Sequence, residues 1–370
     1  MLDKEKIALF LKAVDIFSPS GKEDEMGDFL LNFLKNKGFE NVRKDDIGNV
    51  IGEIGGGEPT ILLSSHMDTV DSHLPVKDEN DKIYGRGTVD AKGPLMSLAI
   101  ASSKFCKKDI NGKIIFAGIV REEISTKGMD TLLDSGININ YAIFAEPNNT
   151  INIVVAYKGR LSLKIIIKSN KGSGHPANSW LFDNSIELAF QFFNRIKDLF
   201  LNDYKGRTPY FTVIPNITEI SSAEGKNVIP AKTEMYIDIR FPPGIISKKI
   251  LEEIDDLKSD FMEENDCSIN TEILSQVEGY SVSTKNELVE SLKKAVQNTL
   301  GVKAKLTRKT GTTFMNIIGN KLDVPTVSIG PGDPKLEHTN NEYILKEDFL
   351  NEIKIIENFI ETFLGFKDGN

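Results

Sequence analysis

The chain has 370 residues, 40% of them hydrophobic and 27% charged, and its 45 basic against 54 acidic residues give a formal net charge of −9. This length exceeds one ordinary core and suits about two globular domains. The acidic balance makes nucleic acid or an anionic membrane surface a poor candidate for a partner.

Helices and strands are predicted to alternate through the first part of the chain. Apolar residues at helical spacing predict helices over residues 7–14 and 23–37, the second ending at a left-handed Gly38. The predicted strands that follow span residues 50–54, 61–66, 113–120 and 141–145, with helices over 92–105 and 129–133. This alternation predicts an α/β fold with a mixed, mainly parallel sheet and helices on both faces.

A second pattern begins near Tyr157. The predicted elements are a strand over 161–168, a helix over 184–201, strands over 211–217 and 233–241, a helix over 247–264 and a strand over 268–273. That order is a ferredoxin-like β-α-β-β-α-β unit, inserted into the α/β pattern.

The α/β pattern resumes after this unit. Thr284-Lys285-Asn286-Glu287 predicts a capping box that opens a helix ending before Gly301, followed by a strand over 326–329 and an amphipathic helix over 346–364. We therefore expect one discontinuous domain, residues 1–156 and 276–370, interrupted by an inserted domain, residues 157–275.

Cysteine usage and the N-terminus bear on the cellular compartment. Cys106 and Cys267 lie far apart without metal-ligand spacing, which indicates a reducing compartment rather than a disulfide framework. The first residues lack the apolar core and cleavage site of a signal peptide, and no run approaches the roughly 18 apolar residues of a membrane span. We expect a cytoplasmic protein.

Histidine and acidic residues stand at the ends of predicted strands or in the loops after them. These short stretches are residues 65–68, 85–90, 121–123, 145–148 and 337–339. Because ligands of an open α/β sheet bind outside the carboxyl ends of its strands, the five stretches could converge on one crevice.

Each of these residues also has an ordinary interpretation. His66 and Asp68 project from the same side of an extended chain, so Asp68 could accept a hydrogen bond from His66 while the other ring nitrogen binds a metal. Asp90 is either a helix N-cap or a carboxylate that bridges two cations. Glu122 and Glu123 are either a solvated loop or a pair in which one binds metal and the other accepts a proton from water.

Glu146 and His338 complete the set, although each alone would be a plain loop residue. Two histidines, one aspartate and two glutamates without a thiolate suit a pair of zinc, cobalt or manganese ions. Two such cations sharing a carboxylate and a water convert that water into a hydroxide near neutral pH.

In their order from His66 to His338, these stretches resemble the dinuclear-zinc aminoacylase and carboxypeptidase family, which includes acetylornithine deacetylase, succinyl-diaminopimelate desuccinylase and glutamate carboxypeptidase. The resemblance implies a zinc-peptidase-like catalytic domain, with the insert as a lid and dimerisation domain. It also implies a homodimer with two Zn²⁺ ions per subunit, for which Co²⁺ can substitute.

The resemblance implies a role for each residue of the set. One zinc is held by His66, Asp90 and Glu146, and the other by Asp90, Glu123 and His338. Glu122 is then the general base and Asp68 orients His66. The peptide bond after Asp90 is often cis in this family.

Residues of the insert also match the family. His175 resembles the histidine that reaches across a dimer to stabilise the oxyanion, and Asn227 and Arg240 resemble its substrate-binding pair, with the planar fork of Arg240 suited to a carboxylate. Taken alone, the three would be a turn histidine, a turn asparagine and a surface-strand arginine.

A substrate-contacting glycine loop is expected at Gly311, Thr312 and Thr313. The aspartate that is common after this loop in the family is Phe314 here, so no acidic role is assigned to that position.

Within the family, the motifs starting at His66, Gly87 and His338 look closest to enzymes that release lysine or ornithine from an amino-group carrier protein in lysine and arginine biosynthesis. Such carriers are acidic. Basic residues could receive one, although solvated strand faces explain them equally well; these are Lys158, Arg160 and Lys164 in the insert and Lys303, Lys305, Arg308 and Lys309 after it.

Three functions remain open. The first is an amino-acid deacylase acting on the carrier conjugate or on acetylornithine or succinyl-diaminopimelate. The second is a dipeptidase or carboxypeptidase with the same metals. The third is a non-catalytic binding protein that keeps the fold, which the presence of Glu122 and all five ligand candidates disfavours.

Overall fold

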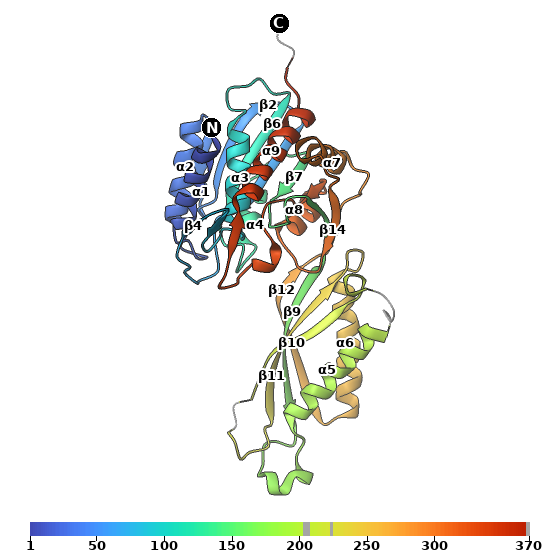
Figure 1. Ribbon diagram of the computed structural model, residues 1–370. Helices are drawn as coiled ribbons and strands as arrows, with labels where there is room; N and C mark the ends of the chain where they lie inside the picture. The colour runs from blue at the N-terminus through green and yellow to red at the C-terminus, as the bar shows by residue number, and fades with distance from the viewer. Residues whose placement is uncertain (203–207, 223–224, 368–370) are drawn as a thin grey trace. The chain divides into compact units, whose positions relative to one another are not determined.

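The computed structural model describes residues 1–202, 208–222 and 225–367 (Figure 1). The chain forms two compact units. Unit 1 comprises Met1–Val155, Ser281–Arg308 and Thr313–Asn370, and unit 2 comprises Ala156–Tyr280 and Lys309–Thr312.

A six-stranded sheet forms the centre of unit 1. Its strand order is β1 (Glu40–Lys44), β2 (Val50–Gly56), β6 (Gly112–Ile119), β3 (Thr60–His66), β7 (Tyr141–Phe144) and β15 (Thr326–Val327). The strands from β6 to β15 run parallel, and β1 and β2 are antiparallel additions. β3 is buried along its whole length, as expected for a parallel strand covered on both faces. The predicted mixed, mainly parallel α/β fold is confirmed.

Helices cover this sheet. They are α1 (Asp3–Asp15), α2 (Asp24–Lys37), α3 (Lys92–Ser103), α4 (Lys127–Asp134), α7 (Glu287–Leu300), α8 (Phe314–Leu322) and α9 (Lys346–Phe363). Gly38 ends α2 with a φ of 89°, as predicted. The prediction for the start of α7 is wrong, because the N-cap is Asn286, whose side chain accepts a hydrogen bond from the Leu288 amide. Asparagine is among the preferred N-cap residues, so the helix begins later than a Thr284 cap would require.

Two short sheets complete the strand arrangement, and the sequence did not predict them. One has the order β13 (Tyr280–Ser281), β8 (Asn152–Tyr157) and β14 (Lys305–Lys309), and the other has the order β16 (Tyr343–Leu345), β5 (Lys82–Tyr84) and β4 (Lys77–Glu79). The antiparallel pairing of β16 with β5 places the segment after His338 beside the segment before Asp90.

Unit 2 is an antiparallel sheet with two helices. The sheet order is β10 (Ile214–Ser221), β11 (Lys232–Phe241), β9 (Gly159–Ser169) and β12 (Cys267–Val277), and the helices are α5 (Ser185–Asn202) and α6 (Ser247–Glu264). Every second residue of β9 is buried, so one sheet face forms the core and the other is polar. The ferredoxin-like order of elements is therefore present. β10 starts later than predicted because Pro209–Phe211 forms a 3₁₀ turn.

The structure bears on two expectations, that no helix spans a membrane and that the two cysteines form no disulfide bond. Within residues 1–202, 208–222 and 225–367, no helix combines the length and the apolar character that a bilayer crossing requires. Cys106 and Cys267 are both free thiols, as their sequence spacing indicated.

Candidate metal centre

Three neighbouring parallel strands of unit 1 end at the same edge of the sheet. The last residue of β3, His66, lies opposite Ile119 of β6. β6 runs on into the turn that carries Glu122 and Glu123, and Glu146 follows shortly after β7. The parallel register therefore brings one histidine and three carboxylates to one edge.

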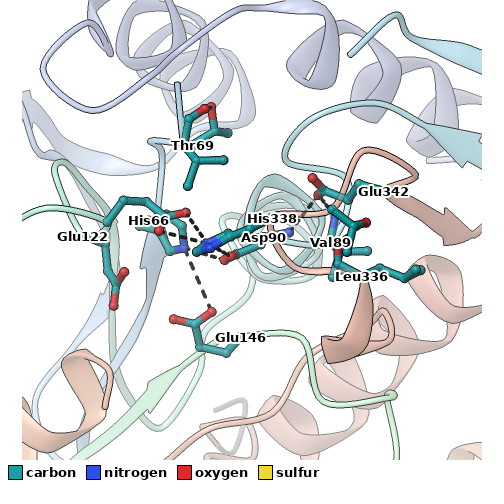
Figure 2. Close-up of polar contacts among 12 residues, drawn as sticks. His66, Thr69, Val89, Asp90, Glu122, Glu146, Leu336, His338 and Glu342 are labelled. Atoms are coloured by element: carbon teal, nitrogen blue, oxygen red, sulfur yellow. Dashed lines mark hydrogen bonds and ion pairs between the residues drawn. The ribbon is translucent and has the colours of Figure 1, made fainter. Parts of the chain in front are cut away.

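Asp90 lies between the two histidines of the site (Figure 2). Its Oδ1 atom is 3.0 Å from Nε2 of His66, and its Oδ2 atom is 3.0 Å from Nε2 of His338. Nε2 of His338 is also 3.0 Å from Oε2 of Glu123. Asp90 thus contacts each histidine with a different oxygen, which is the arrangement that a carboxylate shared by two cations requires. The peptide bond between Asp90 and Ala91 is cis.

Glu146 approaches His66 from the end of β7. Its Oε2 atom lies 4.0 Å from Nε2 of His66, and its Oε1 atom accepts a hydrogen bond of 2.8 Å from the Thr313 hydroxyl. The structure therefore places Thr313, at the N-cap of α8, beside a ligand candidate. The sequence indicated Thr313 as the last residue of the expected substrate loop, and its contact with Glu146 is an addition.

Glu122 lies beside these residues, and its described carboxylate contact is a 3.4 Å approach of the Thr313 hydroxyl, not a histidine. Burial raises the pKa of Glu122 to about 8, with the charges of Glu123 and Asp90 acting in the same direction and His66 against them. A carboxyl group that stands apart from the ligand candidates and titrates near neutral pH suits proton transfer.

Asp68 makes contacts that the sequence analysis did not foresee. Nδ1 of His66 lies 2.9 Å from the main-chain oxygen of Asp68 and 3.4 Å from its Oδ1 atom. The Asp68 carboxylate also accepts hydrogen bonds from the amides of Glu122 (3.0 Å) and Glu123 (3.1 Å) and from the Ser20 hydroxyl (2.6 Å). Its carboxylate therefore holds the turn that presents both glutamates.

The site carries an excess of negative charge. Five carboxylates surround two imidazoles, namely those of Asp68, Asp90, Glu122, Glu123 and Glu146. Hydrogen bonds with Asp90 and Glu123 raise the pKa of His338 to about 10. Burial lowers the pKa of His66, but its hydrogen bonds with Asp68 and Asp90 outweigh burial and raise it. The site therefore strongly favours the binding of positive charge.

This donor set fits divalent cations. One ligand atom from each of His66, Asp90 and Glu123 lies within 4.8 Å of the others, and His338 and Glu146 adjoin them. Imidazole nitrogen and carboxylate oxygen without thiolate suit zinc, cobalt or manganese. The residues present therefore fit a pair of such ions that share Asp90.

The expected substrate-binding residues other than Thr313 belong to unit 2. Nδ2 of Asn227 lies 3.4 Å from Nε2 of the exposed His175. Arg240 donates from Nε to Asp238 (2.6 Å) and approaches the Thr312 hydroxyl with Nη1 (3.3 Å). The adjacent Gly311 is exposed. The structure thus brings His175 to Asn227, and Arg240 to Thr312, within this unit. Phe314 is buried and packs against Phe144 with ring centroids 5.4 Å apart.

Sequence comparison relates this chain to one family of hydrolases. A family model described as peptidase family M20/M25/M40 matches residues 62–362. A LysW-lysine/LysW-ornithine hydrolase from Sulfurisphaera tokodaii is 33% identical over 369 residues, covering 97% of this chain and 96% of the relative.

Solved structures share the fold at low sequence identity. A tripeptidase from Staphylococcus aureus superposes with a TM-score of 0.84 at 19% identity, covering 98% of each chain. The YxeP protein of Bacillus subtilis, described as a dinuclear metal-binding peptidase from the M20 family, gives a TM-score of 0.74 at 14% identity, covering 98% of this chain and 99% of that one.

Proposed function

This chain belongs to peptidase family M20/M25/M40, and from that premise we propose that it is a two-metal hydrolase that releases lysine or ornithine from an amino-group carrier protein. It is a hydrolase of amide bonds. The carrier conjugate as substrate, the metal and the pathway are the proposal, supported by the names of relatives that align along nearly the whole chain.

The proposed metal centre divides the ligand candidates into two overlapping sets. His66, Asp90 and Glu146 would hold one Zn²⁺ ion, and Asp90, Glu123 and His338 would hold the other, with Co²⁺ as a functional substitute. When bound, such ions lower the pKa of a shared water and polarise the amide carbonyl. The observation that carries this proposal is the position of Asp90, one oxygen facing each histidine.

Glu122 is the proposed general base, and Asp68 is its support. Glu122 would take a proton from the attacking water as its oxygen bonds to the amide carbon. The same carboxyl would then give the proton to the amine nitrogen as the carbon–nitrogen bond breaks. Asp68 holds the Glu122 amide, so it fixes where the base stands.

Unit 2, which contains the predicted insert of residues 157–275, is the proposed lid and dimerisation domain. In a homodimer, His175 would stabilise the oxyanion in the partner's site, and its exposed position next to Asn227 is compatible with that role. Arg240, Gly311 and Thr312 would receive the carboxylate of the released amino acid. We also propose that the protein works in the cytoplasm.

The basic residues suggest where an acidic carrier would bind. In the insert, Lys158 is fully buried, and Arg160 and Lys164 form ion pairs with Asp238 and Glu234, so these three offer little free charge. Residues 285–309 instead contain seven basic and two acidic residues, a net charge of 7 − 2 = +5 within a chain of −9. Among them Lys303, Lys305 and Arg308 are exposed, which favours this segment for an acidic partner.

A substrate panel tests the function. A chelator first removes bound metal, and the protein is then reloaded with Zn²⁺ or Co²⁺. The substrates tested are the carrier protein LysW charged with lysine or ornithine, Nα-acetylornithine, N-succinyl-diaminopimelate and dipeptides. Release of free lysine or ornithine from the carrier, restored by metal, is the expected result. Hydrolysis of dipeptides alone would replace the proposal with a peptidase, and failure to hydrolyse any of these amides after reloading would refute both.

A further inference from the structure

A buried ion pair lies next to the candidate metal centre. Nη1 of Arg86 is 2.7 Å from Oε2 of Glu342, and the two side chains are 5% and 0% exposed. Neither residue is a ligand candidate. Removing one member of such a pair leaves an uncompensated buried charge, which is strongly unfavourable.

The second oxygen of Glu342 reaches the backbone of Asp90. Oε1 accepts hydrogen bonds from the amide of Val89 (2.8 Å) and from the amide of Asp90 itself (3.2 Å) (Figure 2). The main-chain oxygen of Glu342 also accepts from the amide of Gly85 at 3.2 Å. Glu342 therefore fixes both ends of the turn that carries Asp90.

Arg86 contacts the loop that carries His338. Its Nη2 atom donates to the main-chain oxygen of Thr339 (3.0 Å), and its Nε atom donates to that of Ser72 (3.3 Å). Thr339 follows His338, whose side chain is 53% exposed and whose φ is 58°. Two segments 248 residues apart in sequence are thus connected through one ion pair.

The other ligand candidates do not depend on this connection. His66 ends β3, and Glu123 and Glu146 follow β6 and β7, so the parallel sheet sets their positions. Asp90 and His338 lie on loops outside the six-stranded sheet. Their separation is therefore set by what joins the two loops.

We propose that Arg86 and Glu342 form a positioning clamp that holds His338 at the correct distance from Asp90, and that the clamp sets the affinity of one cation of the pair. This inference rests on the proposed function. The affected cation is the one shared by Asp90, Glu123 and His338. The other cation shares Asp90 but keeps His66 and Glu146, which the clamp does not touch, so its affinity should change less.

A titration of the metal-free protein with Co²⁺ alone tests the clamp. Glu342→Gln is compared with Glu352→Gln, a matched change at another fully buried glutamate of unit 1, whose oxygens have no hydrogen-bond partner among the described residues. Visible absorption and calorimetry measure the affinity with which each equivalent of Co²⁺ binds. In Glu342→Gln, the second equivalent should bind roughly 10–100-fold more weakly while the first changes little. In Glu352→Gln, both should bind as in the wild type.

Two further measurements keep the test decisive. Arg86→Lys retains one positive charge but cannot reproduce the contacts to Thr339 and Ser72, so it should also weaken the second equivalent. Hydrogen exchange in the metal-free protein should be faster over residues 85–91 and 336–343 in Glu342→Gln than in the wild type, whereas Glu352→Gln should not accelerate it.

The outcomes separate the clamp from the function. Unchanged exchange in both segments together with unchanged cobalt binding would overturn the clamp, as would equal weakening of both equivalents. If the wild type binds no Co²⁺, the proposed two-metal function fails, and the exchange comparison still decides whether the two loops are clamped.

Discussion

The hydroxyl of Thr313 donates a hydrogen bond of 2.8 Å to Oε1 of Glu146, while the other oxygen of that carboxylate faces His66. One oxygen of the buried Glu146 is thereby occupied within the protein, and the other is directed to the proposed cation. Partners of this kind orient metal ligands and tune their affinity.

Thr313→Val should weaken the cation held by His66, Asp90 and Glu146 by roughly 10–100-fold, because valine keeps the shape of the side chain but cannot donate. Thr313→Ser restores the hydroxyl and should bind metal as the wild type does. Titration of the metal-free variants with Zn²⁺ measures the difference. Equal affinity in the valine and serine variants would show that the hydroxyl has no such role.

Glu122→Gln should lower turnover by roughly 10²–10⁴-fold or more, because an amide cannot accept the proton from water. Both metal equivalents should remain, since Glu122 is not among the ligand candidates. Parallel measurement of kcat and bound metal checks both statements. Near-normal turnover, or loss of a metal ion with the activity, would contradict the assignment of Glu122 as base.

The site could be anticipated from sequence where a single strand or turn defines a position. The ends of β3, β6 and β7 follow from apolar runs that stop at polar residues, and helix α6 matches its prediction because its periodicity is clear. The contacts of Thr313, Glu342 and Arg86 could not be predicted, because they join segments that are distant in the sequence. The short strands β5 and β16 were missed because three residues show no usable alternation.

Asp68 illustrates the same limit. The spacing of His66 and Asp68 indicated a side-chain contact, whereas the closest contact uses the main-chain oxygen of Asp68. The sequence cannot show that the turn bearing Glu122 and Glu123 returns its amides to this carboxylate. Local spacing fixes which residues are near each other but not which of their atoms meet.

Asp68→Asn should therefore reduce kcat more than metal affinity. The asparagine side chain has one acceptor oxygen in place of two, so it cannot satisfy the amides of Glu122 and Glu123 and the Ser20 hydroxyl together. His66 keeps its contact with the main-chain oxygen. We expect turnover to fall by about 10–100-fold with the metal content close to two. Loss of metal in proportion to activity would instead indicate that the carboxylate acts through His66.

Glu352 should make the protein less stable as the pH rises. Burial, with the nearby charge of Asp348, raises the pKa of Glu352 well above its usual value. The folded protein then retains a proton that the unfolded chain releases above a pH of about 4.5, so unfolding is favoured as pH rises from there towards the folded pKa. Each unit of difference between the two pKa values costs about 1.4 kcal/mol.

Glu352→Gln removes this titration, and its melting temperature should exceed that of the wild type by more at pH 7 than at pH 5. Thermal unfolding of both proteins at the two pH values, without added metal, provides the measurement. A constant difference, or a smaller one at pH 7, would mean that Glu352 is ionised in the folded protein.

Charge reversal at the start of β14 and in the segment before it tests how the substrate arrives. Lys303→Glu combined with Lys305→Glu changes the net charge of residues 285–309 from +5 to +1 and should lower kcat/KM for the lysine-charged carrier by about tenfold at low salt. The loss should shrink as salt screens the attraction. Hydrolysis of Nα-acetylornithine should not change, because a small substrate does not reach this surface while it is bound at the site.

The control is Lys168→Glu, which changes an exposed lysine on β9 and should leave the carrier reaction unaffected. An equal loss with both substrates would locate the effect in the catalytic site, and no loss with either would remove this segment as the docking surface.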